Sequence, residues 1–122
     1  KMKTEFVIKA FSDACKNRKP GENLIIHSDQ GSQYGSSEFR WYLKNHSFVQ
    51  SMSRRGNCWD NACVESFFRL LKVEELNGYS FNGIDDVRYK VFSYIEYFYN
   101  RKRIHSQLNY MTPTEYENIL IA

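Results

Sequence analysis

The sequence predicts an α/β fold with parallel strands, followed by a helical C-terminal part. Two expected strands, the apolar run at residues 24–26 and the short segment at residues 48–52, alternate along the chain with segments of helical periodicity. This strand–helix–strand–helix order is typical of a layer with parallel strands. The chain has 122 residues, of which 42% are hydrophobic, enough for the core of one compact domain. We expect an α/β part over roughly residues 1–77 and a helical tail over residues 78–122.

The first elements alternate between helix and strand. Residues 4–18 carry apolar side chains at helical spacing and predict an amphipathic helix. Residues 24–26 form an unbroken apolar run, which is typical of a strand buried on both faces. Ser36 or Ser37 can cap a second helix, because a serine hydroxyl accepts a hydrogen bond from the first helical turn. The second strand is expected at residues 48–52.

Three further helices are expected after the second strand. Asp60 or Asn61 can cap a helix that runs to about Leu76. Residues 84–98 repeat apolar side chains at helical spacing and predict a long helix. Residues 112–115, with the sequence Thr-Pro-Thr-Glu, form a capping box with proline at the first helical position, so a short last helix begins there.

Composition and charge narrow the class of protein. No apolar run approaches membrane-spanning length, and the Lys-rich start lacks the apolar stretch of a secretory leader, so we expect a cytoplasmic protein with no membrane partner. The three cysteines include no Cys-x-x-Cys pair, which argues against structural zinc. The formal net charge of +3 is mild, but cations cluster at Arg54-Arg55 and in residues 101–103. Such clusters are either solvated surface or phosphate contacts.

Two carboxylates, Asp29 and Glu65, are the strongest candidates for a functional site. Asp29 lies just past the first apolar run, and the region outside the carboxyl end of a parallel strand is where α/β sheets bind ligands. Glu65 falls in the first turn of the third helix, and Lys72 follows it by two turns on the same face. Two carboxylates can share divalent cations, which is the usual machinery of phosphoryl transfer.

Each carboxylate also has a purely structural interpretation. A carboxylate in the first helical turn stabilises the helix dipole, and Arg69 lies one turn after Glu65, where an ion pair can form. Asp29 can close an Asx-turn at the end of its strand. The residues alone leave both interpretations open.

Longer motifs around the carboxylates resemble a known family. They occupy residues 27–34 (HSDQGSQY), 51–56 (SMSRRG), 59–62 (WDNA) and 65–68 (ESFF). They resemble the integrase core of bacterial insertion-sequence transposases of the OrfB type, which is similar to that of retroviral integrases. The closing motif of that family is matched by Tyr99-Asn100, Arg103, His105-Ser106, Leu108, Tyr110, Thr112-Pro113 and Glu115. The resemblance extends from the first helix to about Glu117.

The resemblance implies an RNase H-like fold and a catalytic triad of two aspartates and one glutamate. Asp29 matches the second aspartate and Glu65 the glutamate, with the family's 35 intervening residues, 30–64. Such enzymes cut and join DNA ends with two Mg²⁺ or Mn²⁺ ions and no small-molecule cofactor. The DNA contacts expected from the resemblance are Lys72, Arg69, Arg54, Arg55, Asn61, Gln33, Arg103 and His105. A hydrogen bond to backbone is the alternative role for His105.

The sequence departs from the family pattern at its beginning. The first aspartate and the opening strands are absent, so two parallel strands remain where five are expected. We therefore expect little DNA cutting or joining by this chain alone, an exposed edge and apolar face on the first strand, and self-association that covers them. Asn109 replaces the usual glycine of the closing motif, and asparagine tolerates the left-handed conformation.

Three functions follow as hypotheses. The leading one is part of a transposase catalytic domain that cuts and joins mobile-element ends, associating with the nucleoid when bound to DNA. The second is a non-catalytic remnant that folds as an oligomer and binds DNA weakly. The third is a metal-dependent nuclease whose third carboxylate comes from a partner chain.

Overall fold

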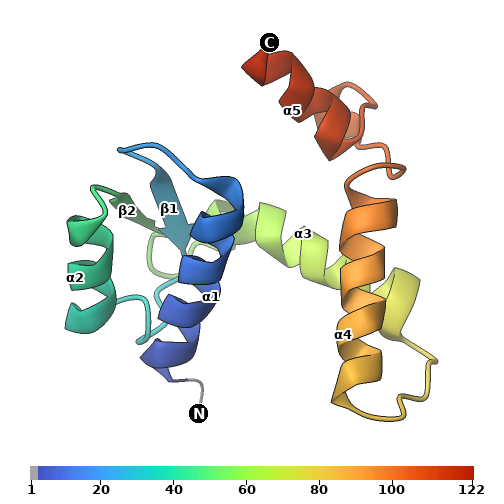
Figure 1. Ribbon diagram of the computed structural model, residues 1–122, viewed down its shortest axis with the longest axis horizontal. Coiled ribbons are helices and arrows are strands. Elements are labelled where there is room, and N and C mark those ends of the chain that lie inside the picture. Colours follow the sequence, from blue (N-terminus) through green and yellow to red (C-terminus); the bar gives the residue numbers. More distant parts are fainter. Residues whose placement is uncertain (1–2) are drawn as a thin grey trace. The chain divides into compact units, whose positions relative to one another are not determined.

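The computed structural model describes residues 3–122, which form two compact units (Figure 1). The first unit ends at Cys63, and the second runs from Val64 to Ala122. None of the helices formed by the described residues is both long and apolar enough to cross a membrane. The expected division near residue 77, between an α/β part and a helical tail, stays a prediction.

The first unit has the order of helices and strands that the sequence predicts. Its elements are α1 (Thr4–Arg18), β1 (Ile25–Ser28), α2 (Ser37–Asn45) and β2 (Val49–Met52). The two strands pair in parallel, with Ile25 opposite Val49. Ser36 caps α2, since its hydroxyl accepts a hydrogen bond from the backbone N–H of Phe39 at 3.1 Å. The predicted parallel α/β layer is therefore confirmed in this unit.

Aromatic rings form the core of the first unit. Phe11 of α1 meets three rings edge-on, and the ring centroids of Phe39, Tyr42 and Phe48 lie 6.4, 6.1 and 5.7 Å from its own. Phe39 and Leu43 of α2 are each only 1% exposed. Burying a side chain of this size contributes about 1.5–3 kcal/mol. This core fixes the layer from which β1 extends toward Asp29.

Only one face of β1 is covered. Ile26 is half-buried and Ser28 is buried, whereas Ile25 is 66% exposed and its partner Val49 is 45% exposed. Successive side chains of a strand point to opposite faces, and only one of these faces packs on the core. The expectation of a strand buried on both faces is therefore wrong for the described residues. The expected exposed apolar face on this strand is present.

A polar loop and a short turn lead from β2 into a long helix. The turn is a 3₁₀ helix (Cys58–Asn61), and after it come helix α3 (Ala62–Leu71) and a π-helical turn (Lys72–Leu76). The expected caps, Asp60 and Asn61, are wrong. Asn57 caps the 3₁₀ turn instead, because its Oδ1 accepts a hydrogen bond from the backbone N–H of Trp59 at 3.0 Å. The carboxylate of Asp60 is bound to Arg54 and is not available as a cap.

The second unit is helical, as predicted. After α3 its elements are α4 (Ile84–Ser93), a π-helical turn (Tyr94–Tyr99), a 3₁₀ turn (Ser106–Leu108) and α5 (Pro113–Ile121). Tyr94 and Leu71 are its buried core residues, 3% and 6% exposed. Thr112 and Glu115 form the expected capping box, with hydrogen bonds of 3.3 and 2.8 Å. Asn109 adopts the left-handed conformation at φ 52°, so the predicted turn forms without glycine.

Candidate metal centre and nucleic-acid interface

Asp29 directly follows β1, and its carboxylate is held in one orientation. Its Oδ1 accepts a hydrogen bond from the backbone N–H of Gly31 at 2.8 Å, which is the Asx-turn that the sequence allows. A Cβ at Gly31 would come within 2.9 Å of that oxygen, so a larger residue would displace it. The side chain is exposed, and Oδ2 makes no hydrogen bond with the described residues. One carboxylate oxygen is therefore available to a ligand.

The turn that carries Asp29 is fastened to the end of β2. Gln30 donates a hydrogen bond from Nε2 to the backbone carbonyl of Ser53 at 2.8 Å. Gln33, an expected DNA contact, lies against the same turn, because its Nε2 is 2.9 Å from the place where a Cβ of Gly31 would stand. The structure thus places Gln33 beside the carboxylate of Asp29.

Arg54 is bound to Asp60. The carboxylate of Asp60 accepts hydrogen bonds from the backbone N–H of Arg54 at 2.8 Å, from Nε at 2.9 Å and from Nη2 at 2.8 Å. These bonds hold the pKa of Asp60 far below its ordinary value. Arg55 is exposed and makes no hydrogen bond or ion pair with the described residues. Arg54 therefore stabilises the turn that ends at the half-buried Asn61, and Arg55 is the available cation of the pair.

Glu65, Arg69 and Lys72 lie along one helix. Glu65 and Arg69 belong to α3, and Lys72 begins the π-helical turn that extends it. All three side chains are exposed. The ion pair that the sequence allows between Glu65 and Arg69 is not formed, and the side chain of Glu65 makes no hydrogen bond or ion pair with any described residue. Its carboxylate is therefore available to a ligand.

The two carboxylates fit a hard divalent cation in their chemistry. Mg²⁺ and Mn²⁺ prefer carboxylate oxygens, and Asp29 and Glu65 each offer them on an exposed side chain. Asp29 belongs to the first unit and Glu65 to the second, so each is described within its own unit. Across residues 3–122, no three His, Cys, Asp or Glu side chains are grouped so as to hold an ion.

Arg103 lies in a network that the sequence analysis missed. Its guanidinium binds both carboxylate oxygens of Glu74, with N–O distances of 2.8, 3.0 and 3.1 Å. The hydroxyl of Tyr94 donates to the same carboxylate at 2.7 Å. Arg103 lowers the pKa of Glu74, and burial raises the pKa of Tyr94. Glu74 and Tyr94 lie in the two π-helical turns, so α-helical periodicity gave no signal of this contact.

His105 is packed against an aromatic ring. It meets Tyr99 edge-on with ring centroids 4.8 Å apart, and its backbone N–H donates to the carbonyl of Met111 at 3.1 Å. Its Nε2 is buried and has no hydrogen-bond partner among the described residues. Burial lowers the pKa of His105, which favours the neutral ring. A DNA contact by this ring stays a prediction.

Comparison with known proteins identifies the family. A profile described as integrase core domain matches residues 46–113, which is more than half of the chain, and a second profile of the same description matches residues 1–58. The chain belongs to the integrase core domain family. This integrase core is 42% identical over 117 residues to the transposase for insertion sequence element IS904 of Lactococcus lactis, covering 96% of the chain and 46% of that protein. It is 43% identical over 122 residues to transposase InsF for insertion sequence IS3A of Escherichia coli K12, covering 100% of the chain and 42% of that protein.

Both relatives are transposases of insertion sequences, which confirms the resemblance carried by the motifs. The integrase core spans less than half the length of either relative. Its family has an RNase H-like fold, and the parallel pair of β1 and β2 with its neighbouring helices is consistent with part of that fold.

Proposed function

We propose that this integrase core is part of a transposase catalytic domain that cuts and joins the DNA ends of an insertion sequence by metal-dependent phosphoryl transfer. Asp29 and Glu65 are two of its three carboxylate ligands. The observation that carries the proposal is the Asp29 turn, in which Gly31 fixes one carboxylate oxygen and the other is left for a ligand. The two transposase relatives support the same function.

Bound Mg²⁺ or Mn²⁺ would activate the attacking water or DNA 3′-hydroxyl and would stabilise the leaving oxygen. The chain itself contributes orientation. Gly31 fixes the direction of the Asp29 carboxylate, and helix α3 holds the backbone of Glu65. Residues 3–122 contain no group of three His, Cys, Asp or Glu side chains that could hold an ion. We therefore expect the third ligand to come from a further segment or from a partner chain, and the isolated chain to be inactive.

We propose that the phosphate contacts come from exposed cations that form no ion pair with the described residues. Arg55, Arg69 and Lys72 are exposed and make no ion pair with the described residues. Arg54 and Arg103 each bind a carboxylate through two nitrogens, so they act on DNA chiefly through the segments that they hold in place. Each exposed cation that contacts a phosphate adds about one to the salt slope of DNA binding. The protein would act in the bacterial cytoplasm, at the nucleoid.

The exposed strand face favours a second candidate function. Ile25 and Val49 form an apolar pair on an uncovered sheet, which suits self-association and a non-catalytic piece that binds DNA weakly. Ile25→Lys should then turn an oligomer into a monomer, as measured by size-exclusion chromatography with light scattering. A wild-type chain that stays monomeric at high concentration would remove this candidate.

A chimera tests the catalytic proposal directly. The chain would replace the matching segment of InsF, and transposition of a marked IS3A element would be measured in cells. We expect the chimera to transpose, and Asp29→Asn or Glu65→Gln to lower transposition at least 100-fold, because each removes a metal ligand. The matched control is Asp13→Asn, which removes a carboxylate that pairs with lysines on α1.

Transposition by the Asp29→Asn chimera at the rate of the unsubstituted chimera would refute the assignment of this carboxylate. Binding of the 122-residue chain to fluorescein-labelled duplex DNA, measured by anisotropy at several salt concentrations, tests the interface separately. Lys72→Gln should weaken this binding and reduce its salt slope by about one.

A further inference from the structure

Trp59 has the most exposed large hydrophobic side chain among the described residues, with 83% of its surface accessible. Tryptophan is usually well buried, because its ring carries more apolar surface than almost any other side chain. Here the ring contributes nothing to the core of the first unit. It lies at the end of the polar loop after β2, six residues before Glu65.

The exposure of Trp59 is built into a fixed turn. Its backbone N–H donates to Asn57 Oδ1 at 3.0 Å, and its carbonyl accepts a hydrogen bond from the backbone N–H of Ala62. The backbone N–H of Asn57 donates to the carbonyl of Arg54 at 3.1 Å, and Asp60 holds Arg54 with three further bonds. Hydrogen bonds on both sides of Trp59 therefore hold its backbone, so the ring is presented to solvent by an ordered segment.

The surroundings of this ring favour an anionic partner. Arg55 is exposed and unpaired, and the side chain of Arg54 is 75% exposed although Asp60 binds it. An apolar protein surface would have to desolvate these charges, whereas DNA offers phosphates to the cations and flat base faces to the indole. A surface that binds unpaired bases usually combines aromatic rings with cations that contact the phosphates.

We infer that Trp59 stacks on an unpaired DNA base, an inference that rests on the proposed DNA-processing function. Stacking needs an accessible base face, so the partner is a single-stranded overhang or a frayed end of DNA. Arg55 binds the adjacent phosphate. Removing the ring should weaken binding of overhang DNA about 5- to 150-fold, and should affect blunt duplex much less.

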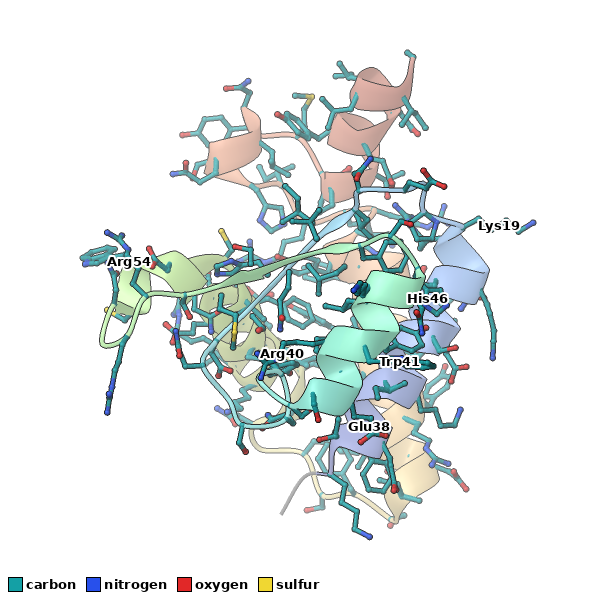
Figure 2. All side chains as sticks on the ribbon, turned by 90° about the vertical axis from the view of Figure 1, so that its left-hand side faces the viewer. Lys19, Glu38, Arg40, Trp41, His46 and Arg54 are labelled. Atoms are coloured by element: carbon teal, nitrogen blue, oxygen red, sulfur yellow. The ribbon has the colours of Figure 1, made fainter. Side chains whose placement is uncertain are left out.

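The chain offers a matched control, because its only other tryptophan, Trp41, is also exposed. Trp41 is 68% exposed on helix α2, and Figure 2 shows it apart from Arg54 and the loop after β2. Trp41→Phe leaves Trp59 as the only tryptophan, and Trp59→Phe leaves Trp41. Each single-tryptophan protein would be titrated with DNA bearing a single-stranded overhang while tryptophan emission is recorded. We expect strong quenching of Trp59 and little change at Trp41.

Anisotropy of the labelled overhang DNA separates this inference from the proposed function. Trp59→Ala should weaken binding within the range above, Trp59→Phe should keep part of the affinity, and Trp41→Ala should change it less than twofold. Circular dichroism would verify that each variant is folded. DNA binding with unquenched Trp59 would overturn the inference and leave the proposed function standing. No DNA binding at all would overturn both, and a concentration-dependent blue shift of Trp59 without DNA would assign the ring to self-association instead.

Discussion

Replacing Gly31 by alanine should weaken metal binding at Asp29 and leave the fold intact. Gly31 does not have a positive φ, so alanine can adopt its backbone conformation. The added Cβ would lie 2.9 Å from Asp29 Oδ1 and 2.9 Å from Gln33 Nε2, whereas ordinary contact begins at 3.4 Å. Both atoms lie at the ends of flexible side chains, so the Asp29 carboxylate should move away by about 0.5 Å. A displacement of about 0.5 Å is as much as a binding site tolerates in the position of a ligand group.

The expected effect on stability is small. Weakening the hydrogen bond from the Gly31 N–H to Asp29 Oδ1 destabilises the fold by up to about 1 kcal/mol. Alanine restricts the unfolded chain more than glycine does, which stabilises the fold by about 0.4–1 kcal/mol. These terms oppose each other, so the free energy of unfolding should change by less than about 1 kcal/mol. Loss of a contact that orients a metal ligand typically lowers affinity about 10- to 100-fold. We therefore expect Mn²⁺ binding to be at least about tenfold weaker.

Paramagnetic broadening of backbone amide signals by Mn²⁺ in the 122-residue chain would measure this affinity. Signals near Asp29 should broaden in the wild-type chain, and Gly31→Ala should need correspondingly more Mn²⁺. Gly35→Ala is the matched control, because its Cβ would meet no atom nearer than 3.9 Å. Equal affinity in the two variants would refute the role of Gly31. Absence of broadening near Asp29 in the wild type would refute metal binding by Asp29 without the third ligand.

Three further predictions concern the second unit, each measured by urea unfolding. Glu74→Gln should cost about 1–3 kcal/mol at pH 7 because it breaks the bidentate pair with Arg103. The ion pair with Arg103 lowers the pKa of Glu74 below its ordinary value of 4.5. The pair therefore stabilises the fold above pH 4.5, and this stabilisation is lost as the pH falls through the lowered pKa. Glu74→Gln should not show this loss of stability in acid. Burial lowers the pKa of His105, so stability should fall as the pH drops below the ordinary value of 6.5, and His105→Phe should flatten the profile between pH 7 and 5. Thr112→Ala should cost about 1 kcal/mol by removing the cap that Glu115 completes, whereas Thr112→Ser should not.

Local signals in the sequence predicted the elements that depend on local bonds. Ser36 and Thr112 cap the helices that they were expected to cap, because each needs only a backbone N–H three residues away. Asp60 failed as a cap because Arg54, six residues earlier, competes for its carboxylate with three hydrogen bonds. Competition of this kind depends on the path of the loop and leaves no periodic pattern in the sequence.

Features that depend on distant segments were harder to predict. The apolar run at residues 24–26 indicated a doubly buried strand, but Ile25 is exposed because burial requires neighbours that residues 3–122 do not provide. For the candidate site, the motifs identified Asp29 and Glu65. The structure adds that a hydrogen bond from Gly31 orients the carboxylate of Asp29, whereas the carboxylate of Glu65 is exposed to solvent. Arg103 and Glu74 are 29 positions apart, so no local motif in the sequence indicated that they pair.

The two π-helical turns make the second unit sensitive to chain length in a particular way. A π-helical turn corresponds to one residue inserted into an α-helix, so losing one residue from Lys72–Leu76 would restore regular α geometry. Every later side chain on that helix would then rotate by about 100° around the axis. If the lost residue precedes Glu74, the Glu74 carboxylate would rotate away from the Tyr94 hydroxyl that it now binds. A one-residue deletion in this helix would therefore change the direction in which the later side chains point, while the helix would keep almost the same length.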